Sequence, residues 1–182
     1  MESTQTRRHM EGRLARVLCD ILGVLLGLLF LIASLFLLNG TVHYIASGGH
    51  INSGLGCVLG VVMLLFLSTC LALPTRLYEH RRLRIAGHLA ASMTSAVTLA
   101  SVALPLVALV LVWTSNPSPG SAAADVGGIV VFFITIIGLA SILIFLPCTY
   151  ILVRKARPQL VHLAIGTVVA GAVGGLLGYL CY

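Results

Sequence analysis

The chain of 182 residues is 59% hydrophobic and only 9% charged, with a mean hydropathy of +1.08. Soluble domains carry about 25% charged residues, so this composition excludes a water-soluble globular fold and predicts lipid surroundings. The net charge of +6 would suit nucleic acid. However, the basic residues lie in short segments between long apolar runs, so we expect no nucleic-acid partner.

The apolar runs predict an all-α, polytopic transmembrane helix bundle of about five spans. Each run is continuous rather than alternating, which argues against a membrane barrel, and each is close to or above the roughly 20 residues that a spanning helix needs. We expect a cytoplasmic N-terminal tail over 1–16 and a single bundle over 17–182. An alternative is four spans followed by a C-terminal re-entrant or interfacial helix. The expected spans are about 17–38, 55–73, 85–113, 126–153 and 160–182.

The first run is interpreted as a retained signal anchor, because it is longer than the roughly 7–15 apolar residues of a cleaved signal peptide. Asp20 is the one carboxylate inside it. It lies within one turn of the cytoplasmic end, so it is expected to reach the interface or to pair with Arg16, four residues earlier on the same helix face.

The basic residues fall before the first run, between the second and third, and between the fourth and fifth. Positive charge stays on the cytoplasmic side during insertion. The sequence therefore predicts a cytoplasmic N-terminus and an extracellular or lumenal C-terminus, in the plasma membrane or an endomembrane. Arginines beside spans also attract anionic lipid headgroups. The three groups are Arg7, Arg8, Arg13 and Arg16; Arg76, Arg81, Arg82 and Arg84; and Arg154, Lys155 and Arg157.

The two inside connections share an order of Leu-Pro, Tyr, a basic cluster and His-Leu-Ala, over 73–90 and 146–164. One interpretation is a duplication in which spans two and three, and four and five, form parallel hairpin copies. The simpler interpretation is that every inside turn needs these residue types.

The third run carries Ser92, Thr94, Ser95, Thr98 and Ser101 ahead of Pro105. Proline has no N–H to give to the carbonyl of Ser101, so a kink is expected. A polar, kinked helix could line a conduit, but it could equally be the central helix of the bundle, because hydroxyls are general packing devices in membranes.

The fifth run is rich in small residues at four-residue spacing, namely Gly171, Gly174, Gly175 and Gly178. Such a face lets a second helix approach closely. It predicts a helix-packing interface, either between copies of the chain or with another membrane protein, or alternatively against the rest of this bundle.

The cysteines divide by their predicted depth. Cys19, Cys70 and Cys148 lie near cytoplasmic ends, where cysteines are candidates for palmitoylation. Cys57 and Cys181 lie near the outer face, where a disulfide is permitted in an oxidising compartment. Each is also an ordinary small apolar residue in a helix.

Asn39 begins a glycosylation sequon, Asn39-Gly40-Thr41, at the outer end of the first span. His43 and His50 follow in the expected outer loop, but two histidines are fewer than the three or four ligands of a zinc site. The sequon touches the end of the span, out of easy reach of the transferase, so glycosylation of Asn39 is possible but not expected, and we expect no metal site.

No paired carboxylates, Ser/His/Asp set or metal-ligand cluster falls at one depth. We therefore expect no catalytic activity and no cofactor. The expected function is that of a non-enzymatic assembly, trafficking or receptor-associated organiser that acts through its helices, with the alternative of a small channel or transporter. The expected partners are the bilayer, its anionic headgroups, and other membrane proteins or a second copy.

Overall fold

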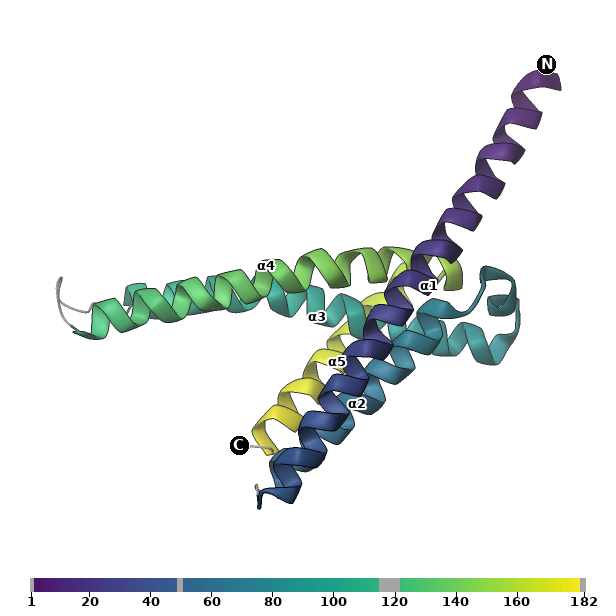
Figure 1. Ribbon diagram of the computed structural model, residues 1–182. Coiled ribbons are helices and arrows are strands. Elements are labelled where there is room, and N and C mark those ends of the chain that lie inside the picture. Colours follow the sequence, from purple (N-terminus) through teal and green to yellow (C-terminus); the bar gives the residue numbers. More distant parts are fainter. Residues whose placement is uncertain (1, 49–50, 115–121, 181–182) are drawn as a thin grey trace.

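The computed structural model describes the backbone of residues 2–48, 51–114 and 122–180, and the side chains within 13–48, 54–114 and 126–175. In these residues it contains helices and no strand, so the predicted all-α class is confirmed (Figure 1). The elements are α1 (Glu2–Ala46), α2 (Ile51–Ala72), the short 3-10 helix η1 (Thr75–Glu79), α3 (Arg81–Thr114), α4 (Ala122–Ala156) and α5 (Leu160–Leu180).

Four helices have the length and apolar composition to cross a membrane, over Arg13–Ala46, Gly54–Ala72, Arg81–Thr114 and Val126–Ala156. The chain is therefore an integral membrane protein by composition and length. In α5 the described side chains form a shorter apolar stretch, Leu160–Gly175. A fifth crossing remains a prediction.

The helix α1 is longer at both ends than its apolar run. It begins at Glu2, so residues 2–16 of the expected tail are helical and continuous with the span, and the helix continues past Leu38 to Ala46. No proline interrupts this segment, and adding a residue to an existing helix costs little once the first turn has formed. The expected first outer loop is correspondingly shorter.

Glycines bring α1 and α2 together. A Cβ at Gly23 would lie 2.5 Å from the carbonyl oxygen of Leu71, and one at Gly27 would lie 2.9 Å from that of Ser68. The Ser68 hydroxyl donates a 2.8 Å hydrogen bond to the carbonyl of Gly27. A glycine pair four residues apart thus lets two backbones pack where lipid offers no hydrophobic driving force.

A proline and a glycine meet where α3 packs on α4. Pro105 lies inside α3 and leaves the carbonyl of Ser101 without its usual helical donor. A Cβ at Gly138 of α4 would lie 2.6 Å from that carbonyl oxygen. Only a glycine therefore allows α4 to cover the freed carbonyl at this distance.

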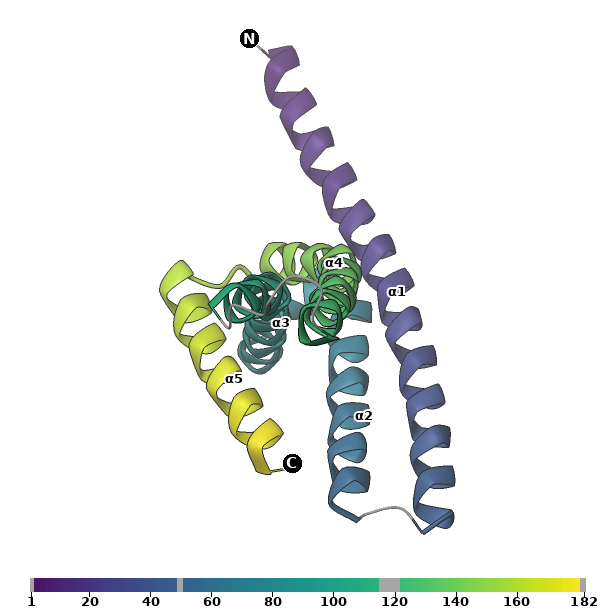
Figure 2. The ribbon, with the colours of Figure 1, turned by 90° about the vertical axis from the view of Figure 1, so that its left-hand side faces the viewer.

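The two pairs, α1 with α2 and α3 with α4, cross near one end and then diverge (Figure 1). Figure 2 looks nearly along α3 and α4, while α1, α2 and α5 lie across the view. The best-packed core is at the crossing, and we call this region the junction. Its buried apolar side chains are Phe30, Leu67, Cys70, Leu71, Ala90, Ala91, Cys148, Ile151 and Leu152.

Candidate functional site

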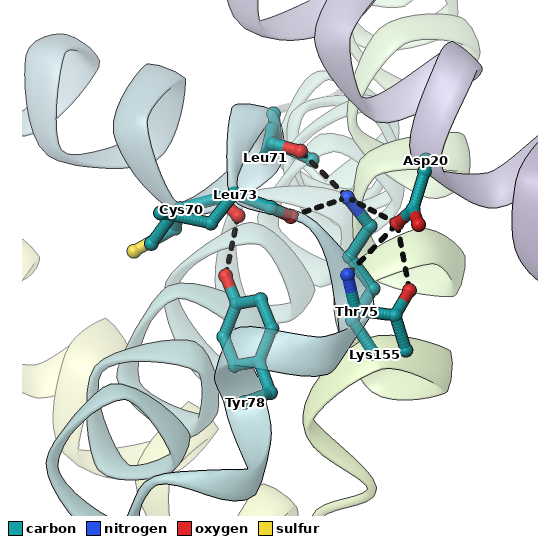
Figure 3. A network of polar contacts seen from close by, with 7 residues as sticks. All are labelled: Asp20, Cys70, Leu71, Leu73, Thr75, Tyr78 and Lys155. Carbon is teal, nitrogen blue, oxygen red and sulfur yellow. Dashed lines mark hydrogen bonds and ion pairs between the residues drawn. The ribbon is translucent and has the colours of Figure 1, made fainter.

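Lys155, near the C-terminal end of α4, is buried at the junction and joins three parts of the chain (Figure 3). Its Nζ donates 2.8 Å hydrogen bonds to the carbonyls of Leu71 and Leu73, at the C-terminal end of α2. It also lies 3.4 Å from Oδ1 of Asp20 in α1. The last carbonyls of a helix have no partner within it and carry partial negative charge. Lys155 therefore caps α2 from a different helix.

The carboxylate of Asp20 completes this arrangement. Its Oδ1 accepts hydrogen bonds from the backbone N–H of Thr75 at 3.0 Å and from the Thr75 hydroxyl at 2.7 Å. Asp20 thus fixes the start of η1 and neutralises Lys155. Its ionic partner is Lys155 and not Arg16, which corrects the expected local pair, because Arg16 is exposed on α1 while Lys155 is held in place by α2.

Two further side chains form hydrogen bonds with backbone carbonyls close to the Lys155–Asp20 pair. The buried Tyr78 hydroxyl of η1 donates to the carbonyl of Cys70, and burial, with Cys70 beside it, raises the pKa of Tyr78 above its usual range. His88 Nε2 lies 3.1 Å from the carbonyl of Ala156. Since a carbonyl can only accept, this nitrogen carries the proton. A Cβ at Gly87 would collide with the Tyr78 ring, so glycine is needed for this packing.

Residues from all three basic segments line one pocket of about 1580 Å³ beside the Lys155–Asp20 pair. The structure therefore brings together side chains that the sequence separates by up to 144 positions, from Arg13 to Arg157. Arg81 and Arg82 lie on α3 and do not line it. We call this pocket the basic pocket.

The small residues of α5 have different surroundings at the two ends of the helix. Near the junction, a Cβ at Gly166 would collide with the hydroxyl of Ser92, so α5 packs on α3 there. Farther along, no described atom of another helix lies within 4 Å of the Cβ position of Gly171, Gly174 or Gly175. The surroundings of Gly178 are outside the described side chains. The described part of this predicted interface thus does not pack against the chain's own helices.

The three cysteines predicted near cytoplasmic ends, Cys19, Cys70 and Cys148, are all buried. Cys70 and Cys148 belong to the junction core, so acylation would require them to leave it, and the structure favours a packing role. Cys57 is a free, partly buried thiol. Cys181 lies outside the described residues, so the disulfide stays a prediction.

The sequon is helical. Asn39 is exposed in α1, but Thr41 is buried and its hydroxyl donates to the carbonyl of Leu37. Sequons are usually modified in surface loops, so this placement disfavours glycosylation. His43 is exposed on the same helix, and His50 is outside the described residues. Within the described part of the chain, no cluster of three metal-ligating side chains occurs.

Four of the five hydroxyls singled out in α3 are satisfied within their own helix, whereas Ser95 lines a shallow, mostly apolar pocket between α3 and α4. Ser92, Thr94, Thr98 and Ser101 each donate to a carbonyl one turn earlier. Ser92, Thr94 and Ser101 are also buried against neighbouring helices. This pattern fits packing and removes much of the reason for expecting α3 to line a conduit.

The two halves of the suspected repeat have different surroundings. Tyr78 and His88 hold junction carbonyls, whereas Tyr150 is exposed and bonds to Arg154 of its own helix, and His162 is exposed. The main pairings, α1 with α2 and α3 with α4, are also not the hairpins that the repeat predicts. The simpler interpretation of the shared order is favoured.

Comparison with known proteins finds no family model, no curated protein and no solved structure that matches this chain.

Two features of the junction were missed from the sequence, although each has a signal. Gly23 and Gly27 form a GxxxG spacing in the first span, the same pattern noticed in the fifth. Lys155 is the only lysine among eleven basic residues. The ammonium group donates to three acceptors from one compact nitrogen, whereas arginine spreads its donors over a planar fork.

Proposed function

We propose that this protein is a non-enzymatic, multi-pass organiser that acts through helix contacts with other membrane proteins or with a second copy of itself. Its roles would be assembly, trafficking or receptor association. The observation that carries the proposal is the open glycine face of α5, where Gly171, Gly174 and Gly175 have no neighbour within 4 Å. Glycine weakens a helix, so a glycine-rich face is best explained by a backbone that packs on it.

The opposite end of α5 supports this view. There Gly166 already performs such packing against Ser92 of α3. The same helix therefore shows both a filled and an unfilled small-residue surface. Exposed valines flank the unfilled part, including Val168, Val169 and Val173, and these would supply van der Waals contact to a partner.

The proposed orientation has the N-terminus in the cytosol, and it follows from the clustering of basic residues. All three basic segments contribute to the basic pocket, so a single membrane face would contain them. If α5 crosses, the C-terminus is extracellular or lumenal. Antibody access to a tag after Tyr182 in intact, unpermeabilised cells tests this topology for a plasma-membrane pool.

The organiser proposal is tested with Gly171→Ile plus Gly175→Ile in the full-length chain. The bulky side chains should block close approach and reduce self-association, or recovery of a crosslinked partner, by about tenfold, equivalent to roughly 1.4 kcal/mol. In-membrane crosslinking followed by size analysis measures this. Gly128→Ile is the matched control, because Gly128 of α4 also has open surroundings.

Unchanged association and unchanged partner recovery in the α5 variant would contradict the proposal. Selective, saturable solute flux by the purified protein in liposomes would replace it with the channel or transporter alternative.

A further inference from the structure

Six arginines line the basic pocket. Arg13 and Arg16 come from α1, Arg76 from η1, Arg84 from α3, and Arg154 and Arg157 from the end of α4 and the turn after it. All six are exposed. Four separate elements therefore present guanidinium groups around one space at the end of the helix bundle.

The positive charge in this pocket is largely uncompensated. Asp20 is already occupied by Lys155 and Thr75, and Glu79 is the other carboxylate in the lining. Among the described side chains, Lys155–Asp20 is the one ion pair. Arg154 instead bonds to the hydroxyl of Tyr150 at 2.6 Å. The lining thus holds several cations for each free carboxylate.

Arg157 has a backbone conformation that is unusual for its residue type. Its φ is +48°, the left-handed region in which helices normally end on glycine. Its N–H closes α4 by bonding to the carbonyl of Val153 at 2.9 Å. An arginine in this conformation costs on the order of 1 kcal/mol, and here it places a guanidinium at the pocket. Glycine would terminate the helix equally well, and the arginine present in its place adds a guanidinium to the lining of the pocket.

We infer that the basic pocket binds an anion carrying two or more phosphate groups, of the class of polyphosphorylated inositol headgroups. Arginine binds phosphate through paired hydrogen bonds from its planar fork, and six arginines exceed what one phosphate or one carboxylate can engage. A volume of about 1580 Å³ admits a sugar-sized headgroup. The pocket lies at the ends of apolar spans, where headgroups are concentrated, so a lipid is the favoured source.

This inference does not depend on the organiser proposal. Lys155 and Asp20 of the junction line the pocket, whereas the open glycines belong to the C-terminal half of α5, and α5 runs away from the junction (Figure 1). The two can therefore fail separately.

The test measures binding to the purified full-length protein in detergent by native mass spectrometry. The probes are dioctanoyl phosphatidylinositol bisphosphate, dioctanoyl phosphatidylserine and soluble inositol trisphosphate. We expect the bisphosphate lipid to bind at least tenfold more tightly than phosphatidylserine. If inositol trisphosphate binds more weakly than the lipid, the source is a membrane lipid. If it binds equally well, the same phosphate site takes a soluble ligand.

The decisive comparison uses two charge-matched double variants. Arg16→Gln plus Arg157→Gln removes two pocket arginines, and Arg81→Gln plus Arg82→Gln removes two exposed arginines outside the lining. We expect at least a tenfold loss of bisphosphate binding in the first and less than a twofold change in the second. Equal losses in both would show diffuse attraction, and equal binding of the two lipids would show that phosphate is not recognised. Either result overturns the inference.

The variant Arg157→Gly distinguishes a loss of bisphosphate binding from a loss of folding stability. Glycine relieves the left-handed strain, so the thermal midpoint should stay the same or rise while bisphosphate binding weakens severalfold. If this variant binds the bisphosphate lipid as tightly as the unchanged protein does, Arg157 does not contribute to the site. That result would contradict the inference drawn from its backbone conformation.

Discussion

A single lysine determines much of the junction. Lys155 is buried and serves two carbonyls of α2 and the carboxylate of Asp20. A buried polar atom that loses its partner costs about 1–3 kcal/mol, and breaking a buried ion pair costs about 3–5 kcal/mol. Because Asp20 is 33% exposed and can be solvated, the lower part of that range applies here.

Lys155→Met should therefore destabilise the protein by about 3 kcal/mol. Arg154→Met, at the exposed neighbouring position, should change stability by less than about 0.5 kcal/mol. Thermal unfolding in detergent, followed by circular dichroism, measures both. Equal midpoints for the two variants would mean that the buried ammonium contributes nothing to the fold.

The residue types at the junction could be recognised from the sequence, but their partners could not. Asp20 stands out in the sequence as the one carboxylate in the first span, and helix spacing predicts the nearby Arg16 as its partner. The actual partner lies 135 positions away. Pairing at this range depends on how helices cross, and no local spacing rule contains that information.

At the scale of elements, helix existence and type followed directly from the apolar runs. The observed α2 to α5 begin and end within about four residues of the expected spans, because roughly 20 apolar residues in lipid leave the backbone no alternative to helix. Packing between elements was harder to predict. Several glycines occur in the helices, and the sequence does not indicate which of them face the backbone of another helix. That is seen only when the helices are packed together in the structure.

The contact of α3 with α4 gives a direct test. Gly138→Leu would drive a side chain into the carbonyl of Ser101, which lies 2.6 Å from the Cβ position. It should separate the two helices and cost at least about 2 kcal/mol, as overpacking does. Gly128→Leu on the same helix meets open space and should be tolerated.

Disulfide crosslinking between cysteines placed on facing positions of α3 and α4 measures this separation in native membranes. Crosslinking that survives Gly138→Leu at the level seen for Gly128→Leu would contradict the close approach. In that case the carbonyl freed by Pro105 would be satisfied in another way.

At the scale of the whole molecule, the two helix pairs meet at the junction and diverge (Figure 2). Membrane helices tilt from the bilayer normal by about 20° on average and by up to about 40°. If all four helices cross one bilayer within this range of tilt, the angle between the two helix pairs should be smaller in lipid than in Figure 2. The connection through 73–80 and the polar junction would act as the pivot.

Spin labels at Leu55 of α2 and Leu111 of α3, both exposed and far from the junction, can measure this. With Cys57 and Cys181 replaced by serine, double electron–electron resonance in nanodiscs should give a distance on the order of 20 Å, about two interhelical spacings. A distance on the order of 50 Å, about the length of α3 at 1.5 Å per residue, would show that the diverging arrangement persists in lipid.

The sequence alone determined that this is a membrane protein, that it is helical, and roughly where α2 to α5 begin and end. These properties depend on local apolar length and on the cost of an unpaired backbone in lipid. Only the tertiary structure decided that Lys155 is buried, that arginines from three segments share one pocket, and that the far glycines of α5 are open. Those facts depend on which distant residues meet when helices cross, and a contact between distant residues is not a property of either segment by itself.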